Sequence, residues 1–427
     1  MKLLLNSKSV ILNPMITRKF FAAVLLFLCT LSCTAQDRGP WDPIQYGADP
    51  SGILDSTSAI QKVLNAAGSL MGGIVLVRPG TYLISSCLTV PNGVRFQGSG
   101  AFFTYGGTII KNTGSGPAIC LNATSGGGTH SSGRFVEVSN MMIQGNGSTD
   151  DGIDITGSST ISPQGYKISN VQLSNFGGEG IKITGTSYGT IEKASMNGTG
   201  TSPVCFDVEG GSLYTEVSYF DQVSEEGCVI GTRVLAGNNL YFNHFDLNAN
   251  QTGLYISGST FNLFFDNTNI VYPTQNGIEI AAMTNFIGRI QFRNTTIDML
   301  GASASETAIY AHRNASYTIF DTDFYMTDIE NGTTPPTDAI VTDGGSCISF
   351  EQLRNVPGTS SIGSLCPFNV TGYFQINGYN VPVASSTQTT GALVCIKSGG
   401  STGVFGGSPP VYGTCTAISG ATCTICQ

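Results

Sequence analysis

The sequence predicts an all-β protein built as a parallel β-helix, with one helix capping its N-terminal end. Three observations lead to this prediction. Glycine supplies 55 of the 427 residues, nearly twice its usual share of about 7%. Short alternating apolar segments recur every 22 to 31 residues. Between them lies a second recurring segment that often contains asparagine. A repeat of this length is typical of stacked units that cannot bury an apolar face alone.

The first 35 residues have the features of a secretory signal peptide. Basic residues precede the apolar run FFAAVLLFLCTL, which is followed by the small residues of CTAQ. This run is too short to span a bilayer and suits a cleavable signal, with cutting expected after Ala35. A lipoprotein anchored at Cys33 fits less well, because Thr30 stands where a leucine is expected. We therefore expect a secreted, extracellular protein without a membrane span.

Residues 36–380 are predicted to form the β-helix, with a capping helix at its start. The segment STSAIQKVLNAA (56–67) places Ile60, Val63, Leu64 and Ala67 on one apolar stripe, which suits a cover for the open end of a solenoid. Asp55 is the expected N-cap, and Gly68 the expected stop. Residues 381–427 lose the repeat and are rich in Gly, Ser and Cys, which indicates a C-terminal cap or tail. In a secreted chain the cysteines are expected to form disulfides.

The repeat aligns two apolar columns that would face the core. The first column is Ile153, Ile181, Phe206, Cys228, Leu254, Ile278, Ile309 and Ile340, and the second begins two residues later and includes Ile230. In the intervening segments, asparagines 140, 170, 267 and 294 share one position, which His244 also occupies. Asparagine tolerates left-handed turn geometry and can stack its amides from coil to coil.

Carboxylates gather on the outward side of the same strands. Asp151 and Glu179 take the same turn position in adjacent coils, so their backbones should lie about 4.8 Å apart. The outward column is predicted to read Asp154, Lys182, Asp207, Val229, Tyr255, Glu279, Tyr310 and Val341. Two carboxylates this close raise the pKa of one of them, which keeps a general acid protonated.

The segment YGADPSGILDSTSAIQKVLNAAG, followed by GGIVLVRPGTYLIS, resembles the opening of the pectate-lyase-like superfamily of rhamnogalacturonases and epimerases, to which polygalacturonases and phage tailspikes are related. The resemblance implies a right-handed β-helix that binds or processes acidic, pectin-type polysaccharide. In STDDGID, Asp151 matches an aspartate of the polygalacturonase motif, and Glu179 is the acid of the next coil, GGEGI. The GHG and RIK segments of polygalacturonases do not occur in this chain.

These residues lead to a hydrolase hypothesis with two alternatives. Asp151 and Glu179 are predicted as the catalytic pair, together with Asp154 and Asp207, and Lys182, Tyr255 and Tyr310 as substrate-binding residues. The first pair has the spacing of a retaining glycosidase, about 5 Å, and Asp154 with Asp207 that of an inverting one, about 9.5 Å. A hydrolase of this kind needs no cofactor or metal.

The first alternative is a non-catalytic, adhesin-like glycan-binding protein, whose acidic face is merely solvated and neutralised by Lys182. The second is a Ca²⁺-dependent lyase, with Asp150, Asp151 and Asp154 as ligands and Lys182 as the base. The net charge of −9 argues against a nucleic-acid partner. The oligomeric state is left open.

Overall fold

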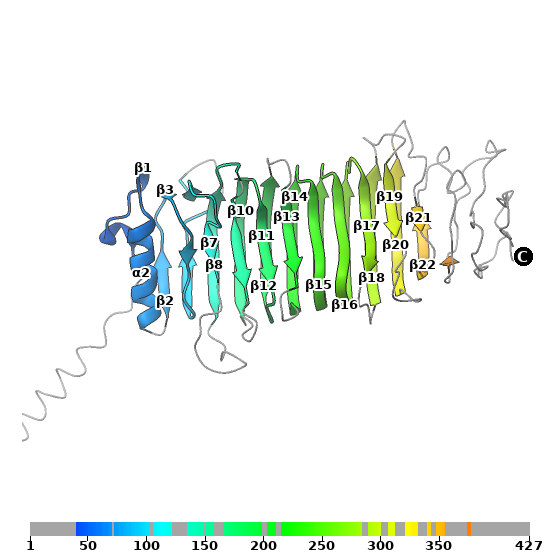
Figure 1. Ribbon diagram of the computed structural model, residues 1–427, viewed down its shortest axis with the longest axis horizontal. Coiled ribbons are helices and arrows are strands. Elements are labelled where there is room, and N and C mark those ends of the chain that lie inside the picture. Colours follow the sequence, from blue (N-terminus) through cyan, green and yellow to red (C-terminus); the bar gives the residue numbers. More distant parts are fainter. Residues whose placement is uncertain are drawn as a thin grey trace, which may run out of the picture. The chain divides into compact units, whose positions relative to one another are not determined.

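The computed structural model describes residues 40–376, except 71, 102–105, 122–134, 149, 158–164, 199–202, 211–214, 284–288, 300–305, 312–320, 332–339, 343–346 and 355–373. The predicted signal peptide and the cysteine-rich C-terminal segment lie outside the described residues. Within the described part, the fold is a right-handed parallel β-helix whose coils follow one another along a single axis (Figure 1). The predicted fold class is therefore confirmed.

Every strand pairs in parallel with the equivalent strand of the next coil, which produces three stacks. The first stack contains β4 (Leu88–Thr89), β7 (Ile119–Cys120), β9 (Ile153–Thr156), β11 (Glu179–Thr184), β13 (Val204–Glu209), the first parts of β15 (Ile230–Asn248) and β16 (Thr252–Val271), β17 (Asn276–Met283), β19 (Thr307–Ala311) and β21 (Ile340–Thr342). The second stack contains β2 (Gly73–Leu76), β5 (Val94–Gln97), β8 (Val136–Gln144), β10 (Tyr166–Phe176), β12 (Thr190–Gly198), β14 (Glu216–Glu226), the later parts of β15 and β16, β18 (Arg289–Met299), β20 (Asp321–Asn331), β22 (Cys347–Arg354) and β23 (Phe374–Ile376). The third stack contains β1 (Ser51–Asp55), β3 (Gly80–Ile84), β6 (Thr108–Asn112) and the end of β8, and it continues through the ends of β10, β12, β14, β15, β16, β18, β20 and β22.

The two apolar columns face the core, but the predicted alignment of the coil that contains Cys228 and Ile230 is wrong. Phe206 pairs with Thr232, and Val208 pairs with Val234, so Cys228 and Ile230 do not belong to the columns. The Glu-Gly pair at 226–227 resembles the start of β11, yet Glu226 ends β14 and β15 begins only at Ile230. The intervening turn holds Gly227 at φ +70°. This four-residue shift also replaces Val229 in the outward column by Arg233.

The asparagine column is confirmed. Asn140, Asn170, Asn267 and Asn294 all have φ between +52° and +56°, and His244 occupies the same position at +52°. The Asn170 Nδ2 donates to Asn140 Oδ1 at 2.8 Å, and the Asn294 Nδ2 donates to Asn267 Oδ1 at 3.1 Å. The coils therefore repeat one left-handed turn and link it by amide hydrogen bonds.

The capping helix is present, with different ends from those predicted. Two helices precede the coils: η1 (Pro43–Tyr46) and α2 (Thr57–Ser69), whose predicted apolar stripe is buried. The N-cap position is Ser56, while the Asp55 carboxylate accepts hydrogen bonds from the Thr57 backbone N–H and the Ser85 hydroxyl. Gly68 lies inside the helix and does not end it. A Cβ at this position would come within 2.6 Å of Pro91.

Two disulfides, Cys87–Cys120 and Cys205–Cys228, link neighbouring coils, as expected for a secreted chain. The predicted disulfides of the C-terminal segment lie outside the described residues. Among the described helices, none has the length and apolar character needed to cross a membrane.

A glutamate stands in the apolar core between coils. Glu225 of β14 is fully buried and pairs in register with Met196 on one side and Leu247 on the other. Its Oε1 accepts a hydrogen bond from Thr232 Oγ1 at 2.7 Å, while Oε2 has no partner among the described residues. Burial raises the pKa of Glu225 well above its ordinary value of 4.5. The burial therefore favours the protonated, neutral form of this side chain in the folded protein.

The raised pKa of Glu225 predicts a specific pH dependence of stability. The pKa is higher in the folded than in the unfolded chain, so its contribution is complete below about 4.5 and is lost as pH rises toward the folded pKa. We expect the free energy of unfolding of Glu225→Gln to rise relative to that of the wild type, by about 1 kcal/mol per pH unit over this range. Urea unfolding of both proteins between pH 5 and 8 measures the difference. Parallel stability curves would show that Glu225 ionises freely in the folded protein.

Candidate functional site

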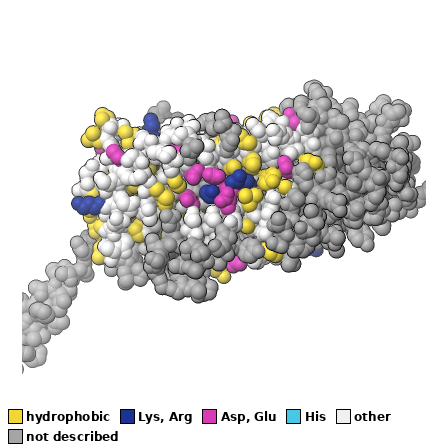
Figure 2. Space-filling model, in the orientation of Figure 1, with side chains coloured by type: hydrophobic (Ala, Val, Ile, Leu, Met, Phe, Trp, Pro, Cys, Tyr) yellow, Lys and Arg dark blue, Asp and Glu magenta, His cyan; other side chains and the backbone are white. Residues whose placement is uncertain are grey.

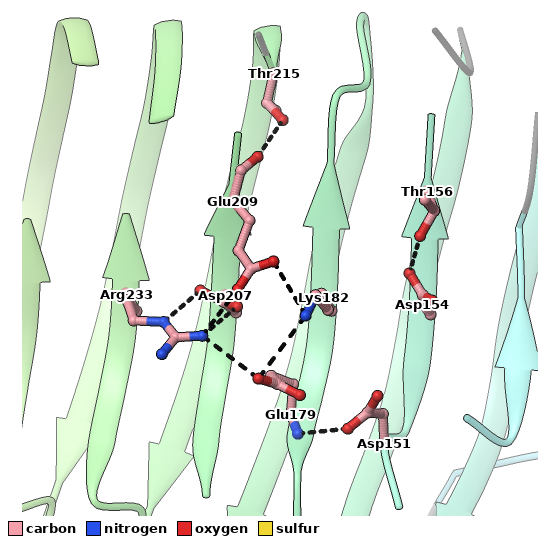
Figure 3. A network of polar contacts seen from close by, with 9 residues as sticks. All are labelled: Asp151, Asp154, Thr156, Glu179, Lys182, Asp207, Glu209, Thr215 and Arg233. Carbon is pink, nitrogen blue, oxygen red and sulfur yellow. Dashed lines mark hydrogen bonds and ion pairs between the residues drawn. The ribbon is translucent and has the colours of Figure 1, made fainter. Parts of the chain in front are cut away.

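A cluster of seven charged side chains lies on the outward side of the first stack (Figure 3). The charged cluster consists of Asp151, Asp154, Glu179, Lys182, Asp207, Glu209 and Arg233. It forms one group of carboxylates and basic side chains on an exposed face (Figure 2). The parallel register produces it, because Asp154, Lys182, Asp207 and Arg233 are direct neighbours on β9, β11, β13 and β15.

Arg233 holds three carboxylates together. Its Nε and Nη2 donate to the two oxygens of Asp207 at 2.8 and 2.7 Å, a bidentate pair. The same Nη2 lies 3.1 Å from Glu209 Oε1 and 3.4 Å from Glu179 Oε1. Asp207, predicted to be outward-facing, does point away from the core, but its side chain is 0% exposed.

Lys182 pairs with glutamates and not with the aspartates on either side of it. Its Nζ lies 3.1 Å from Glu209 Oε2 and 4.0 Å from Glu179 Oε1. Lys182 lies between Asp154 and Asp207 in the outward row but forms its ion pairs with the glutamates. Burial lowers the pKa of Lys182, but Glu209 and Glu179 raise it more, and the net shift is upward. A lysine base for a lyase needs the opposite shift.

Asp151 sits at the edge of the cluster, in the turn before β9. Its Oδ1 accepts a hydrogen bond of 2.8 Å from the backbone N–H of Glu179. Burial, followed by the neighbouring Glu179 carboxylate, raises the pKa of Asp151 to about 7. A Cβ at position 178 would come within 2.1 Å of the Asp151 carboxylate, so a side chain there would displace this carboxylate. The predicted pair of Asp151 and Glu179 is thus in contact, with Asp151 largely protonated below neutral pH.

The other two aspartates also have raised pKa values. Burial raises the pKa of Asp154, whose carboxylate accepts a hydrogen bond from the Thr156 hydroxyl. Burial raises the pKa of Asp207 to about 6, although its bond to Arg233 acts in the opposite direction. Carboxylates with such values, clustered on one exposed face, are typical of a functional site.

The structure brings together all five charged residues that the sequence predicted, and it adds two. Tyr255 and Tyr310 continue the outward row beyond Arg233, with Glu279 between them, and both are half-buried. Sequence reasoning missed Arg233 because of the register error in its coil. It also missed Glu209, which lies in the row of Thr156 and Thr184.

The carboxylates that come closest to a metal site differ from those predicted for calcium. Among the described residues, ligand oxygens of Glu179, Asp207 and Glu209 all lie within 4.8 Å of one another. Asp150 is instead buried and accepts hydrogen bonds from backbone N–H groups of Asn146 and Gly177. Lys182 and Arg233 already form ion pairs with these three carboxylates, so a divalent cation fits them poorly unless these side chains are displaced.

Residues 44–279, more than half of the chain and including the whole charged cluster, match the family model described as rhamnogalacturonase A/epimerase, pectate lyase-like. The chain belongs to this family. Membership confirms the resemblance seen in the opening segment and places the protein among carbohydrate-active β-helices. A search of the curated proteins found no match.

Solved structures of similar fold support the same architecture. The A-module of the mannuronan C-5 epimerase AlgE6 of Azotobacter vinelandii is 16% identical, with 87% of this chain and 100% of that chain covered and a TM-score of 0.51. The enzymatically active domain of tailspike protein 2 of bacteriophage CBA120 is 14% identical, with 82% and 53% covered and a TM-score of 0.56. At these identities the likeness concerns the fold alone.

Proposed function

We propose that the protein is a secreted glycoside hydrolase that cleaves a pectin-type or other uronate-containing polysaccharide at the charged cluster. One observation carries the proposal: Asp151, with its pKa raised to about 7, contacts Glu179, whose carboxylate is ion-paired with Lys182 and Arg233. Two carboxyl groups in different environments are the usual acid and base, or acid and nucleophile, of a glycosidase.

The roles follow from the surroundings of each group. Asp151 is protonated near neutral pH and can donate its proton to the oxygen of the leaving sugar. Glu179 acts as the base or nucleophile, held in place by two cationic side chains. Asp207 and Asp154 assist this pair, and Lys182, Tyr255 and Tyr310 position the substrate along the outward row. The polysaccharide-related names of family and structural neighbours agree with this substrate class.

A product assay on defined polysaccharides tests the proposal. Purified protein is incubated with polygalacturonan, rhamnogalacturonan and alginate, and reducing ends and absorbance from unsaturated uronates are measured. New reducing ends without that absorbance support hydrolysis. Unsaturated products would instead establish a lyase, and retention of a polymer without any product would establish the adhesin-like alternative.

The pH profile of turnover follows from the raised pKa values of Asp151 and Asp207. The general acid must be protonated, so kcat/KM should fall about tenfold per pH unit above about 7, as Asp151 ionises. Below about 6, protonation of Asp207 breaks its ion pair with Arg233, and activity should fall again. Initial rates between pH 4 and 9 measure both limbs. A rate that stays constant from pH 7 to 9 would remove Asp151 from the role of acid.

A further inference from the structure

A groove of about 490 Å³ lies on the second stack, away from the charged cluster along the same strand. Strand β15 connects the two regions, with Arg233 in its first part and Tyr241 in the part that pairs with β14. The register between β15 and β16 shifts between Val234 and Ala236, between these two parts. The volume lies within the range of about 300–1,000 Å³ that is usual for ligand sites.

One wall of the groove is aromatic. Tyr241 and Phe264 line the groove, and Tyr219 continues their row on the preceding coil. Their ring centroids are 4.7 and 5.0 Å apart, and their planes differ by 8° and 11°. Tyr219 is 52% exposed at one end of the row. Because these rings stack face to face, they form a continuous, largely apolar strip along one side of the groove.

The next row along the same strands is polar, with Asn243, Asp266 and Arg293 as neighbours in register. Asn243 donates to Asp221 and accepts from Asn267. By contrast, no hydrogen bond or ion pair engages the Asp266 carboxylate within the described part of the chain. In the next coil, the exposed Arg293 guanidinium lies 5.9 Å from the Tyr325 ring centroid.

We propose that this groove is a second polysaccharide-binding site, separate from the charged cluster. An apolar strip beside the Asp266 carboxylate and the exposed Arg293 guanidinium suits a pyranose chain, whose C–H surface and hydroxyl groups need both kinds of partner. The coils repeat every 4.8 Å or so, close to the length of one sugar unit, so successive units meet equivalent positions. Asp221 and Asp266 leave no positive surplus for a nucleic-acid backbone.

A second site has a defined consequence for an enzyme acting on a polymer. Binding one part of the chain in the groove raises the effective concentration of its other parts at the charged cluster. The advantage exists only for polymers long enough to reach both regions. This inference rests on the proposed function for the identity of the polymer, whereas binding in the groove is measurable without turnover.

The test uses the double variant D266N/R293Q, which keeps the net charge at −9. The matched control is D246N/R95Q, which removes an exposed acid and an exposed base outside the groove. Binding to polygalacturonan, rhamnogalacturonan and alginate is measured by affinity electrophoresis. The thermal midpoint verifies folding, and the single variant R293Q serves if the double variant is unstable.

We expect the groove variant to bind the preferred polymer about tenfold more weakly than the wild type or the control. Its kcat/KM should fall on that polymer and stay unchanged on a short oligosaccharide. Wild-type binding by D266N/R293Q, or no binding of any polymer by the wild type, would overturn the inference. Binding that depends on the groove in a protein that cleaves nothing would leave this site standing and remove the proposed function.

Discussion

Replacing Asp151 by Asn should lower kcat on the preferred polysaccharide by about 10²- to 10⁴-fold, the usual contribution of a positioned general acid. Asparagine keeps the shape of the side chain, and its Oδ1 can still accept the hydrogen bond from the Glu179 N–H. The fold and the binding of substrate should therefore persist. Reducing-end assays at pH 6, with the thermal midpoint and KM as controls, measure the effect. Activity within a few-fold of the wild type would move the acid to another residue.

Glu179→Gln tests the second member of the pair. Its effect on the pH profile distinguishes a catalytic role of Glu179 from a purely structural one. Glutamine cannot act as a base or nucleophile, so turnover should be abolished. Asp151 should also respond, because the Glu179 carboxylate contributes to its raised pKa. In any residual activity, the alkaline limb of the pH profile should therefore shift to lower pH. An unshifted limb would show that the two carboxylates do not interact.

The fold was predictable because a solenoid repeats its determinants. Each coil carries the same apolar pair and the same left-handed turn, so the asparagines at 140 and 170 predict a position that even His244 occupies. Local similarity misleads where a turn changes length. Residues 226–227 repeat the Glu-Gly of β11, but the turn that contains Cys228 delays the next strand by four residues. A disulfide from Cys205 to Cys228 fixes this longer turn.

The candidate site was predictable only where the register was correct. Asp151 and Glu179 met as expected because β9 and β11 pair in the register that the repeat predicts, with Asp154 opposite Lys182. Arg233 was missed because its coil was predicted four residues out of register. The omission mattered because Arg233 forms ion pairs with Asp207, Glu179 and Glu209. Side-chain pairing was a further limit, since periodicity places Lys182 between two aspartates but does not say which carboxylates its flexible chain reaches.

Arg233→Met should destabilise the protein by about 3–5 kcal/mol at pH 8, because it leaves a buried carboxylate without its counter-charge. Asp207 is 0% exposed and is bound by Arg233 through two hydrogen bonds. The pKa of Asp207, already about 6, rises further without the guanidinium. An acid whose pKa is higher in the folded than in the unfolded protein stabilises the fold fully below its unfolded pKa of 3.8. This stabilisation is lost as pH rises through the folded pKa. The cost of the substitution should therefore shrink at pH 5, where Asp207 protonates.

The double variant R233M/D207N separates charge from packing. With Asn at 207, no buried charge remains, so most of the lost stability should return at pH 8. Asp207→Asn alone should cost less than R233M, because Arg233 keeps Glu209 and Glu179 as partners. Lys182→Met is the matched control, since its partners are both partly exposed and the loss should be smaller. Urea unfolding at pH 5 and 8 measures these free energies. If R233M loses the same stability at both pH values and D207N does not restore it, Arg233 acts through packing and not through its charge.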